Sequence, residues 1–171
     1  ENNSLSSGQV LKEPYDAEKA RIIVREMTEL LVLDLVRKGL VTKQVTLTIS
    51  YDRESLITVY QGASLQDSVF YVSRTGKRYL GIVTLDHYGR PHPNHAHGTG
   101  HLSSYTSSTR KIMETMLELY DRIIDPDLLV RRVNIVAAGV ISENEIPTET
   151  EKGVVGGQTD LFSMMDTEEE K

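Results

Sequence analysis

Two stretches of the chain repeat apolar residues with the 3.6-residue period of a helix that packs against a core. The first begins at Asp16, a favourable N-cap, and ends at Gly39, which suits the position just beyond a helix. The second begins within residues 106–108, where three hydroxyl side chains can act as caps, and Asp125-Pro126 ends it. The pattern predicts two amphipathic helices, each with one buried face.

Strict alternation of apolar and polar residues predicts a strand over residues 44–51. The apolar residues share one face of this strand, and Thr46, Thr48 and Ser50 share the other. Threonine is common in strands because of its β-propensity alone. The alternative interpretation is a row of hydroxyl groups that contacts phosphates from an open sheet face.

Two further strands are expected. Residues 131–140 place Arg132 and Asn134 on the face opposite to their apolar residues. Residues 4–11 form a more polar strand, in which Gly8 allows another backbone or a ligand to come close. The backbone N–H groups at that glycine are candidates for phosphate contact.

The middle of the chain, residues 52–97, shows no clean period. We expect a hairpin in which residues 68–74 pair with residues 79–86 across Thr75-Gly76-Lys77. Residues 86–98 are rich in glycine and proline, so they are expected to form a loop.

The order of these elements predicts an α+β fold of the βαββαβ type. We expect one mostly antiparallel four-stranded sheet with both helices on one face, while the other face stays open to solvent. Residues 1–142 would form this domain, with an irregular insertion at 53–97. Residues 143–171 are expected to be a disordered acidic tail.

The net charge of −6 argues at first against a nucleic-acid partner. The charge is unevenly distributed, however. Residues 143–171 carry nine acidic and two basic side chains, and residues 1–142 are left with a net charge of +1. A near-neutral body can still carry a basic face, so the overall charge does not exclude DNA.

The chain has no cysteine, no signal-peptide pattern and no apolar run long enough to span a membrane. The absence of cysteine fits a reducing compartment. We therefore expect a cytoplasmic protein without a membrane partner.

All five histidines lie between residues 87 and 101, and neutral imidazoles can ligate a metal. Their spacing matches no zinc pattern, and two prolines interrupt the cluster. A metal-binding protein is one alternative function, and a ferredoxin-like regulatory domain that pairs with itself through its sheet is another. No catalytic constellation and no glycine-rich phosphate loop are found. The candidate metal ligands are His92, His95, His97 and His101.

Several segments together resemble a known family. Residues 4–11, Ser-Leu-Ser-Ser-Gly-Gln-Val-Leu, resemble the strand that opens the little-finger domain of Y-family translesion DNA polymerases. Residues 36–49 are similar to the first helix and second strand of that domain, and residues 88–110 and 125–135 resemble its UmuC-like, ImpB/MucB/SamB-type branch. The resemblance covers about residues 4–141, although residues 60–82 look longer than in a standard little finger.

A short motif in the tail resembles the pentapeptide with which bacterial proteins dock on the sliding clamp of DNA replication. It occupies residues 158–162 and follows a glycine-rich segment. Leu161 and Phe162 can fill an apolar pocket, while the Gln158 amide can donate and accept hydrogen bonds. A disordered tail gains little from such residues unless a partner binds them.

The resemblance implies a fragment that binds DNA but does not polymerise it. The palm, fingers and thumb of the family are missing, and with them the palm carboxylates that hold two Mg²⁺ ions. The fragment itself therefore needs no cofactor. The implied partners are a primer–template duplex, the sliding clamp and the remaining polymerase domains, and the implied setting is DNA repair and the SOS response. The chain begins at Glu1 rather than at a methionine, as expected of a fragment or a processed product.

The candidate DNA contacts are hydroxyls, backbone N–H groups and a few basic or amide side chains, which hold phosphates without reading bases. Ser108 and Arg110 belong to this set because the N-terminus of a helix favours an anion, although capping and solvation are the alternative roles. The full set is Ser6, Ser7, Gly8, Lys43, Thr46, Thr48, Arg90, Ser108, Arg110, Arg132 and Asn134.

Overall fold

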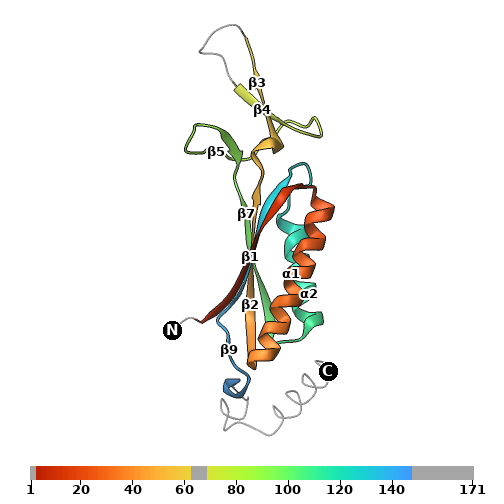
Figure 1. Cartoon of the computed structure of the whole chain (residues 1–171), viewed down its shortest axis with the longest axis vertical. Helices are drawn as coiled ribbons and strands as arrows, with labels where there is room; N and C mark the ends of the chain where they lie inside the picture. Colours follow the sequence, from red (N-terminus) through yellow and green to blue (C-terminus); the bar gives the residue numbers. More distant parts are fainter. Residues whose placement is uncertain (1–2, 63–68, 148–171) are drawn as a thin grey trace.

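The structure is a computed structural model that describes residues 3–62 and 69–147. Its body is one antiparallel sheet with two helices on a single face, and an arm built from two hairpins projects from one end of the sheet (Figure 1). The fold class expected from the sequence is therefore confirmed.

The main sheet has the strand order β1-β8-β2-β7, and every pairing in it is antiparallel. A short strand, β9, adds to the beginning of β2. The strands of the body are β1 (Ser4–Tyr15), β2 (Leu40–Tyr51), β7 (Ala96–Thr106), β8 (Val130–Ala138) and β9 (Ile141–Ser142).

The two helices, α1 (Ala17–Lys38) and α2 (Thr109–Ile123), begin and end where the sequence predicts. The Asp16 carboxylate caps α1 by accepting a hydrogen bond from the Lys19 backbone N–H at 2.9 Å. Gly39 ends this helix in the left-handed conformation, with φ of 65°, and its N–H donates to carbonyls of the last turn. Ser108 caps α2 in the same way, accepting from the Lys111 N–H at 3.3 Å.

The core lies between the helices and one face of the sheet. Leu47, Ile49 and Ile135 of the central strands are completely buried there, together with Leu35 of α1 and Met116 of α2. This packing follows from strand alternation, which turns every second residue of β2 and β8 toward the helices.

Two glycines of β7 let α2 approach the sheet closely. A methyl group at Gly98 would come within 2.7 Å of Leu119 and 2.9 Å of Ile123, and one at Gly100 within 2.7 Å of Thr115. The expectation of a loop at residues 86–98 is wrong for Pro91–Pro93, which form the short strand β6, and for its last residues, which begin β7. Gly98 marks close packing of a strand rather than a turn.

The arm differs from the single hairpin that the sequence predicts. Residues 73–77 do turn as expected, but only Val72 and Arg78 form a bridge across that turn. Residues 79–86 are not one strand, and the pairs that form are β3 with β4 and β5 with β6. The arm contains η1 (Arg53–Ser55), β3 (Leu56–Tyr60), β4 (Val69–Ser73), β5 (Val83–Leu85) and β6 (Pro91–Pro93).

The arm is a long connection between two neighbouring strands. It leaves the sheet after the end of β2 at Tyr51 and returns at the start of β7, and Ile49 pairs directly with Ala96 across these strands. The βαββαβ order is thus kept, with its central hairpin enlarged.

The folded part extends slightly beyond residue 142. After β9, a short 3₁₀ turn, η2 (Glu143–Glu145), is held by a capping box between Ser142 and Glu145. The remainder of the expected tail, with the motif at 158–162, lies outside the described residues. No helix in the described part of the chain is long and apolar enough to cross a membrane.

Candidate nucleic-acid interface

The face of the main sheet that carries no helix is lined by polar side chains in cross-strand rows. Residues directly opposite one another in an antiparallel sheet point to the same side. The rows, read from β1 through β8 and β2 to β7, are Ser4–Ala138–Gln44–His101, Ser6–Val136–Thr46–Thr99, Gly8–Asn134–Thr48–His97 and, over three strands, Val10–Arg132–Ser50. We call these residues the open face.

The burial pattern agrees with this assignment. Leu47, Ile135 and Val133 are fully buried, whereas Thr46, Thr48 and the other open-face residues of β2 and β8 are half-buried or exposed. The polar residues therefore point away from α1 and α2. None of the paired residues of the open face is acidic, so nothing on it repels a phosphate directly.

The centre of the open face is partly ordered by its own contacts. The Thr48 hydroxyl and Nδ1 of His97 lie 2.8 Å apart and form a hydrogen bond between β2 and β7. On the other side, the Asn134 side chain lies over Gly8, and a methyl group on that glycine would collide with its Oδ1 atom. The absence of a side chain at Gly8 thus makes room for the Asn134 amide.

Six of the residues proposed from sequence share the open face: Ser6, Gly8, Thr46, Thr48, Arg132 and Asn134. Ser7 does not, because it lies in the row of Ile135 and Leu47 on the helix-covered side, although its own side chain is exposed. Strand alternation separates it from Ser6 and Gly8.

Four other proposed residues lie away from these rows. Lys43 sits at the bulge where β2 begins, with its ammonium 5.6 Å from the centre of the Tyr105 ring. Ser108 is the cap of α2 and Arg110 lies in that helix's first turn. Arg90 is in the arm, where its Nε donates to Asp86 at 2.9 Å.

The structure adds three residues of β7, His97, Thr99 and His101, to the open face. The sequence does contain a pattern that indicates this strand, because residues 97–102 alternate His or Thr with Gly or Leu. Residues 97 and 98 were assigned to a glycine- and proline-rich loop, and the alternation was therefore missed.

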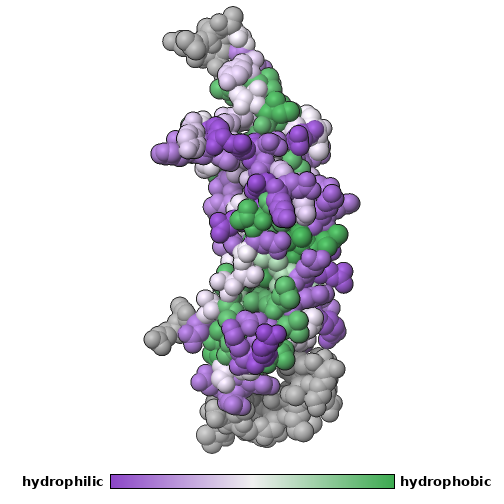
Figure 2. Space-filling model, viewed as in Figure 1, coloured by the Kyte–Doolittle hydropathy of each residue, from purple (hydrophilic) through white to green (hydrophobic). Residues whose placement is uncertain are grey.

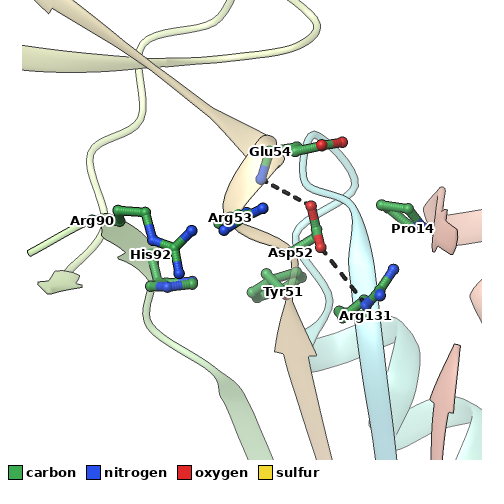
Figure 3. A pocket seen from close by; sticks show the side chains of 8 residues that line it. All are labelled: Pro14, Tyr51, Asp52, Arg53, Glu54, Arg90, His92 and Arg131. Carbon is green, nitrogen blue, oxygen red and sulfur yellow. Dashed lines mark hydrogen bonds and ion pairs between the residues drawn. The ribbon is translucent and has the colours of Figure 1, made fainter. Parts of the chain in front are cut away.

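A pocket of about 360 Å³ lies at the arm end of the sheet (Figure 3). Arg90 and His92 border it from the arm, Arg53 from η1 and Arg131 from β8. Asp52 lies between them; its Oδ1 is 4.0 Å from Nε of Arg131, and its Oδ2 accepts from the Glu54 N–H at 2.9 Å. Three arginines and two carboxylates line this wall, and Arg90 is also paired with Asp86 at 2.9 Å.

Tyr51 closes the floor of this pocket. Its hydroxyl accepts a hydrogen bond of 2.8 Å from the Asp125 backbone N–H, and burial raises the pKa of Tyr51 to about 12. A phenol that stays neutral and bonded to the backbone serves to fix the end of β2 against the loop before β8.

The metal-site alternative is not supported. His97 and His101 are four residues apart on one strand, a separation of about 13 Å at the usual rise of a strand. His92 lies on β6, where its Nε2 contacts Asp86 Oδ2 at 3.0 Å. Within residues 3–62 and 69–147, no group of His, Cys, Asp or Glu side chains is arranged to hold a metal ion.

Comparison with protein families matches residues 2–150 of the chain to the impB/mucB/samB family C-terminal domain. The chain belongs to this family and is the C-terminal part of a UmuC-like, Y-family DNA polymerase. No curated protein matches the chain.

Proposed function

We propose that the open face binds the sugar–phosphate backbone of a primer–template duplex without reading its sequence. The observation that carries this proposal is the set of cross-strand rows of hydroxyl, amide, imidazole and guanidinium groups with no carboxylate among them. Contacts of these kinds to phosphate oxygens fix the position of a duplex but carry no sequence information. Such tolerance suits an enzyme that copies damaged templates.

The dimensions of the sheet support a groove-spanning contact. Four strands at about 4.8 Å spacing give a face about 15 Å wide, slightly wider than the ~12 Å major groove. The edge strands β1 and β7 would then meet the two phosphate backbones on either side of the groove. Ser6 and Gly8 lie on one edge, and His97 and Thr99 lie on the other.

The test is a titration of the chain with labelled blunt duplex DNA at several salt concentrations. We expect the logarithm of the affinity to fall linearly with the logarithm of the salt concentration, because phosphate contacts release counterions. Arg132→Ala should weaken binding to all sequences alike and reduce the salt slope by about 1.

Arg25→Ala is the matched control, because Arg25 is an exposed arginine on α1, in the layer that covers the other face. It removes the same charge and should change the affinity much less. Absence of duplex binding even at about 20 mM salt, or an equal loss in both variants, would contradict the proposal.

We further propose that the parent protein is an error-prone translesion polymerase acting in DNA repair, with its two Mg²⁺ ions in a palm domain outside this chain. Residues 158–162 would tether it to the sliding clamp, with Gln158, Leu161 and Phe162 as the anchors. A peptide spanning these residues should bind the clamp, and replacing Leu161 and Phe162 by alanine should abolish binding. Retained affinity of the double variant for the clamp would contradict the proposal that residues 158–162 bind it.

A further inference from the structure

The turn between β5 and β6, residues 86–90, is held rigid by one carboxylate. Asp86 Oδ1 accepts hydrogen bonds from the backbone N–H groups of Tyr88 and Arg90, each at 2.8 Å. Its Oδ2 contacts Arg90 Nε at 2.9 Å and His92 Nε2 at 3.0 Å. Gly89 takes the positive φ of 76° that completes the turn. The conformation of this turn is therefore fixed by its own hydrogen bonds, although the turn lies in the arm and not in the core of the body.

This rigid tip presents an aromatic ring to solvent. The Tyr88 side chain is 77% exposed. The guanidinium of Arg90 lies 5.0 Å from the centre of its ring, and the His87 ring meets it edge-on at 5.3 Å. An exposed aromatic ring that gains no burial from the fold, yet is oriented by its neighbours, is ready to bind a flat partner without further ordering.

The position of the tip identifies that partner. The β5–β6 turn projects to the side of the sheet opposite to α1 and α2, which is the side of the open face (Figure 1). Arg90 and His92 also line the pocket beside Arg131, at the end of the sheet where Arg132 lies. A DNA strand that continued beyond the end of the open face would meet these residues next.

The charge of the arm agrees with an anionic partner. Residues 52–95 carry five basic and four acidic side chains, a net charge of +1, whereas the rest of residues 1–142 has no net charge. Figure 2 shows the tip as a hydrophilic projection below the more apolar outer part of the arm. Basic surfaces with interleaved aromatic rings are typical of proteins that bind single-stranded nucleic acid.

We infer that Tyr88 stacks on an unpaired base of the DNA strand that leaves the duplex held by the open face, and that Arg90 supports the ring and contacts the adjoining phosphate. Bases in the interior of a duplex are already stacked on both faces, whereas an unpaired base offers a free face to the ring. The inference rests on the proposed duplex binding and adds a second, single-stranded part to the ligand.

The experiment compares two DNA probes with the full chain at a fixed low salt concentration: a blunt duplex and the same duplex with a single-stranded overhang of about six nucleotides. The overhang is placed on the 5′ end in one probe and on the 3′ end in another. We expect one of the two to bind about 5- to 100-fold more tightly than the blunt duplex, a range that stacking of one base supplies.

Three variants locate the effect. Tyr88→Ala should remove the gain from the overhang and leave the blunt-duplex affinity unchanged, whereas Tyr88→Phe should keep the gain because it keeps the ring. Tyr60→Ala is the matched control, because Tyr60 is also 77% exposed but lies on β3 of the other hairpin, and it should keep the gain.

The outcomes separate this inference from the proposed function. If the blunt duplex binds but neither overhang improves the affinity, the stacking site is refuted while duplex binding stands. An equal loss with Tyr60→Ala and Tyr88→Ala would show nonspecific adhesion to the arm and would also refute it. If the blunt duplex itself is not bound, the proposed duplex binding is contradicted, and with it the inference that rests on it.

Discussion

The body and the arm of this molecule are stabilised by different means. In the body, apolar residues of β2, β8, α1 and α2 are buried completely, and the strands are long. In the arm the strands have three to five residues, and Ile57, Tyr60, Leu80 and Leu85 are each more than half exposed. Isolated two-stranded hairpins are marginally stable in water, so the arm must depend on specific attachments. Hydrophobic burial determines the body, whereas turns and polar contacts determine the arm.

The arm is attached to the segment between α2 and β8 by hydrogen bonds and an ion pair. The buried hydroxyl of Ser55 accepts from the Leu129 N–H at 2.9 Å and donates to the Leu129 carbonyl at 3.1 Å. Asp127 accepts from the Thr75 hydroxyl at 2.9 Å and lies 3.7 Å from the Lys77 ammonium. The arm is therefore bonded at its base and unsupported farther out.

The largest expected effect tests the body. Leu47→Ala removes a completely buried side chain from the centre of the sheet and should lower the free energy of unfolding by about 2–5 kcal/mol. Ile57→Ala in the arm removes a side chain that is 54% exposed and should cost less than about 1 kcal/mol. Urea unfolding followed by circular dichroism measures both. Similar losses would show that the arm and the body unfold through one shared core.

An intermediate effect tests the base of the arm. Ser55→Ala leaves the Leu129 N–H without its partner, and we expect a cost of about 1–3 kcal/mol. Hydrogen exchange should show the loss mainly in β3 and β4 rather than in β2 and β8. Ser103→Ala, at an exposed serine of β7, is the control and should change little. Unchanged exchange in the arm of the Ser55 variant would argue against this attachment.

The smallest effect concerns an exposed ion pair of the body. Arg21 donates two hydrogen bonds to Asp121 at 2.9 and 3.0 Å, and this lowers the pKa of Asp121 below its usual value. The pair contributes stability above the pKa of the unfolded carboxyl, and this contribution is lost as the pH falls through the lower pKa of the folded state. Both side chains are about half exposed, so the contribution is less than about 1 kcal/mol.

Asp121→Asn should therefore lower stability slightly at neutral pH and have less effect as the pH falls through the lowered pKa of the wild-type carboxyl. Urea unfolding over this pH range measures the difference. Asp127→Asn is the corresponding change at the base of the arm. It weakens the hydrogen bond from Thr75, which attaches the arm to the body, and should therefore loosen β4 without affecting the contact between α1 and α2. A larger global loss for Asp121→Asn than for Leu47→Ala would overturn the ranking.

The sequence predicted the body well because burial there leaves a periodic pattern. The caps at Asp16 and Gly39 and the alternation in β2 and β8 were sufficient to define both helices and the central strands. The strand β7 was missed, since residues 86–98 were expected to form a loop and no strand was predicted over the rest of β7; Gly98 suggests a loop when the helix that packs on it is not considered. The pairing of β3 with β4 was missed because neither strand buries a continuous face.

The open face could be predicted as far as strand parity allows. The alternation of side chains along each strand correctly placed Thr46, Thr48, Arg132 and Asn134 on one face. The same alternation puts the adjacent residues Ser6 and Ser7 on opposite faces, so the inclusion of Ser7 was wrong. The location of Arg90 could not be predicted, because the path of the arm depends on contacts between residues distant in sequence, such as Ser55 with Leu129.

The pairing of Ile49 with Ala96 means that the arm begins and ends at adjacent points of the sheet. A tight two-residue turn could join β2 to β7 there without shifting the register of either strand. The arm is therefore an insertion that could be removed or transferred as a unit. A chain in which the arm is replaced by a short turn should still fold. Insertion of residues 52–95 into a relative with a simple turn at this place should transfer the binding properties of the arm.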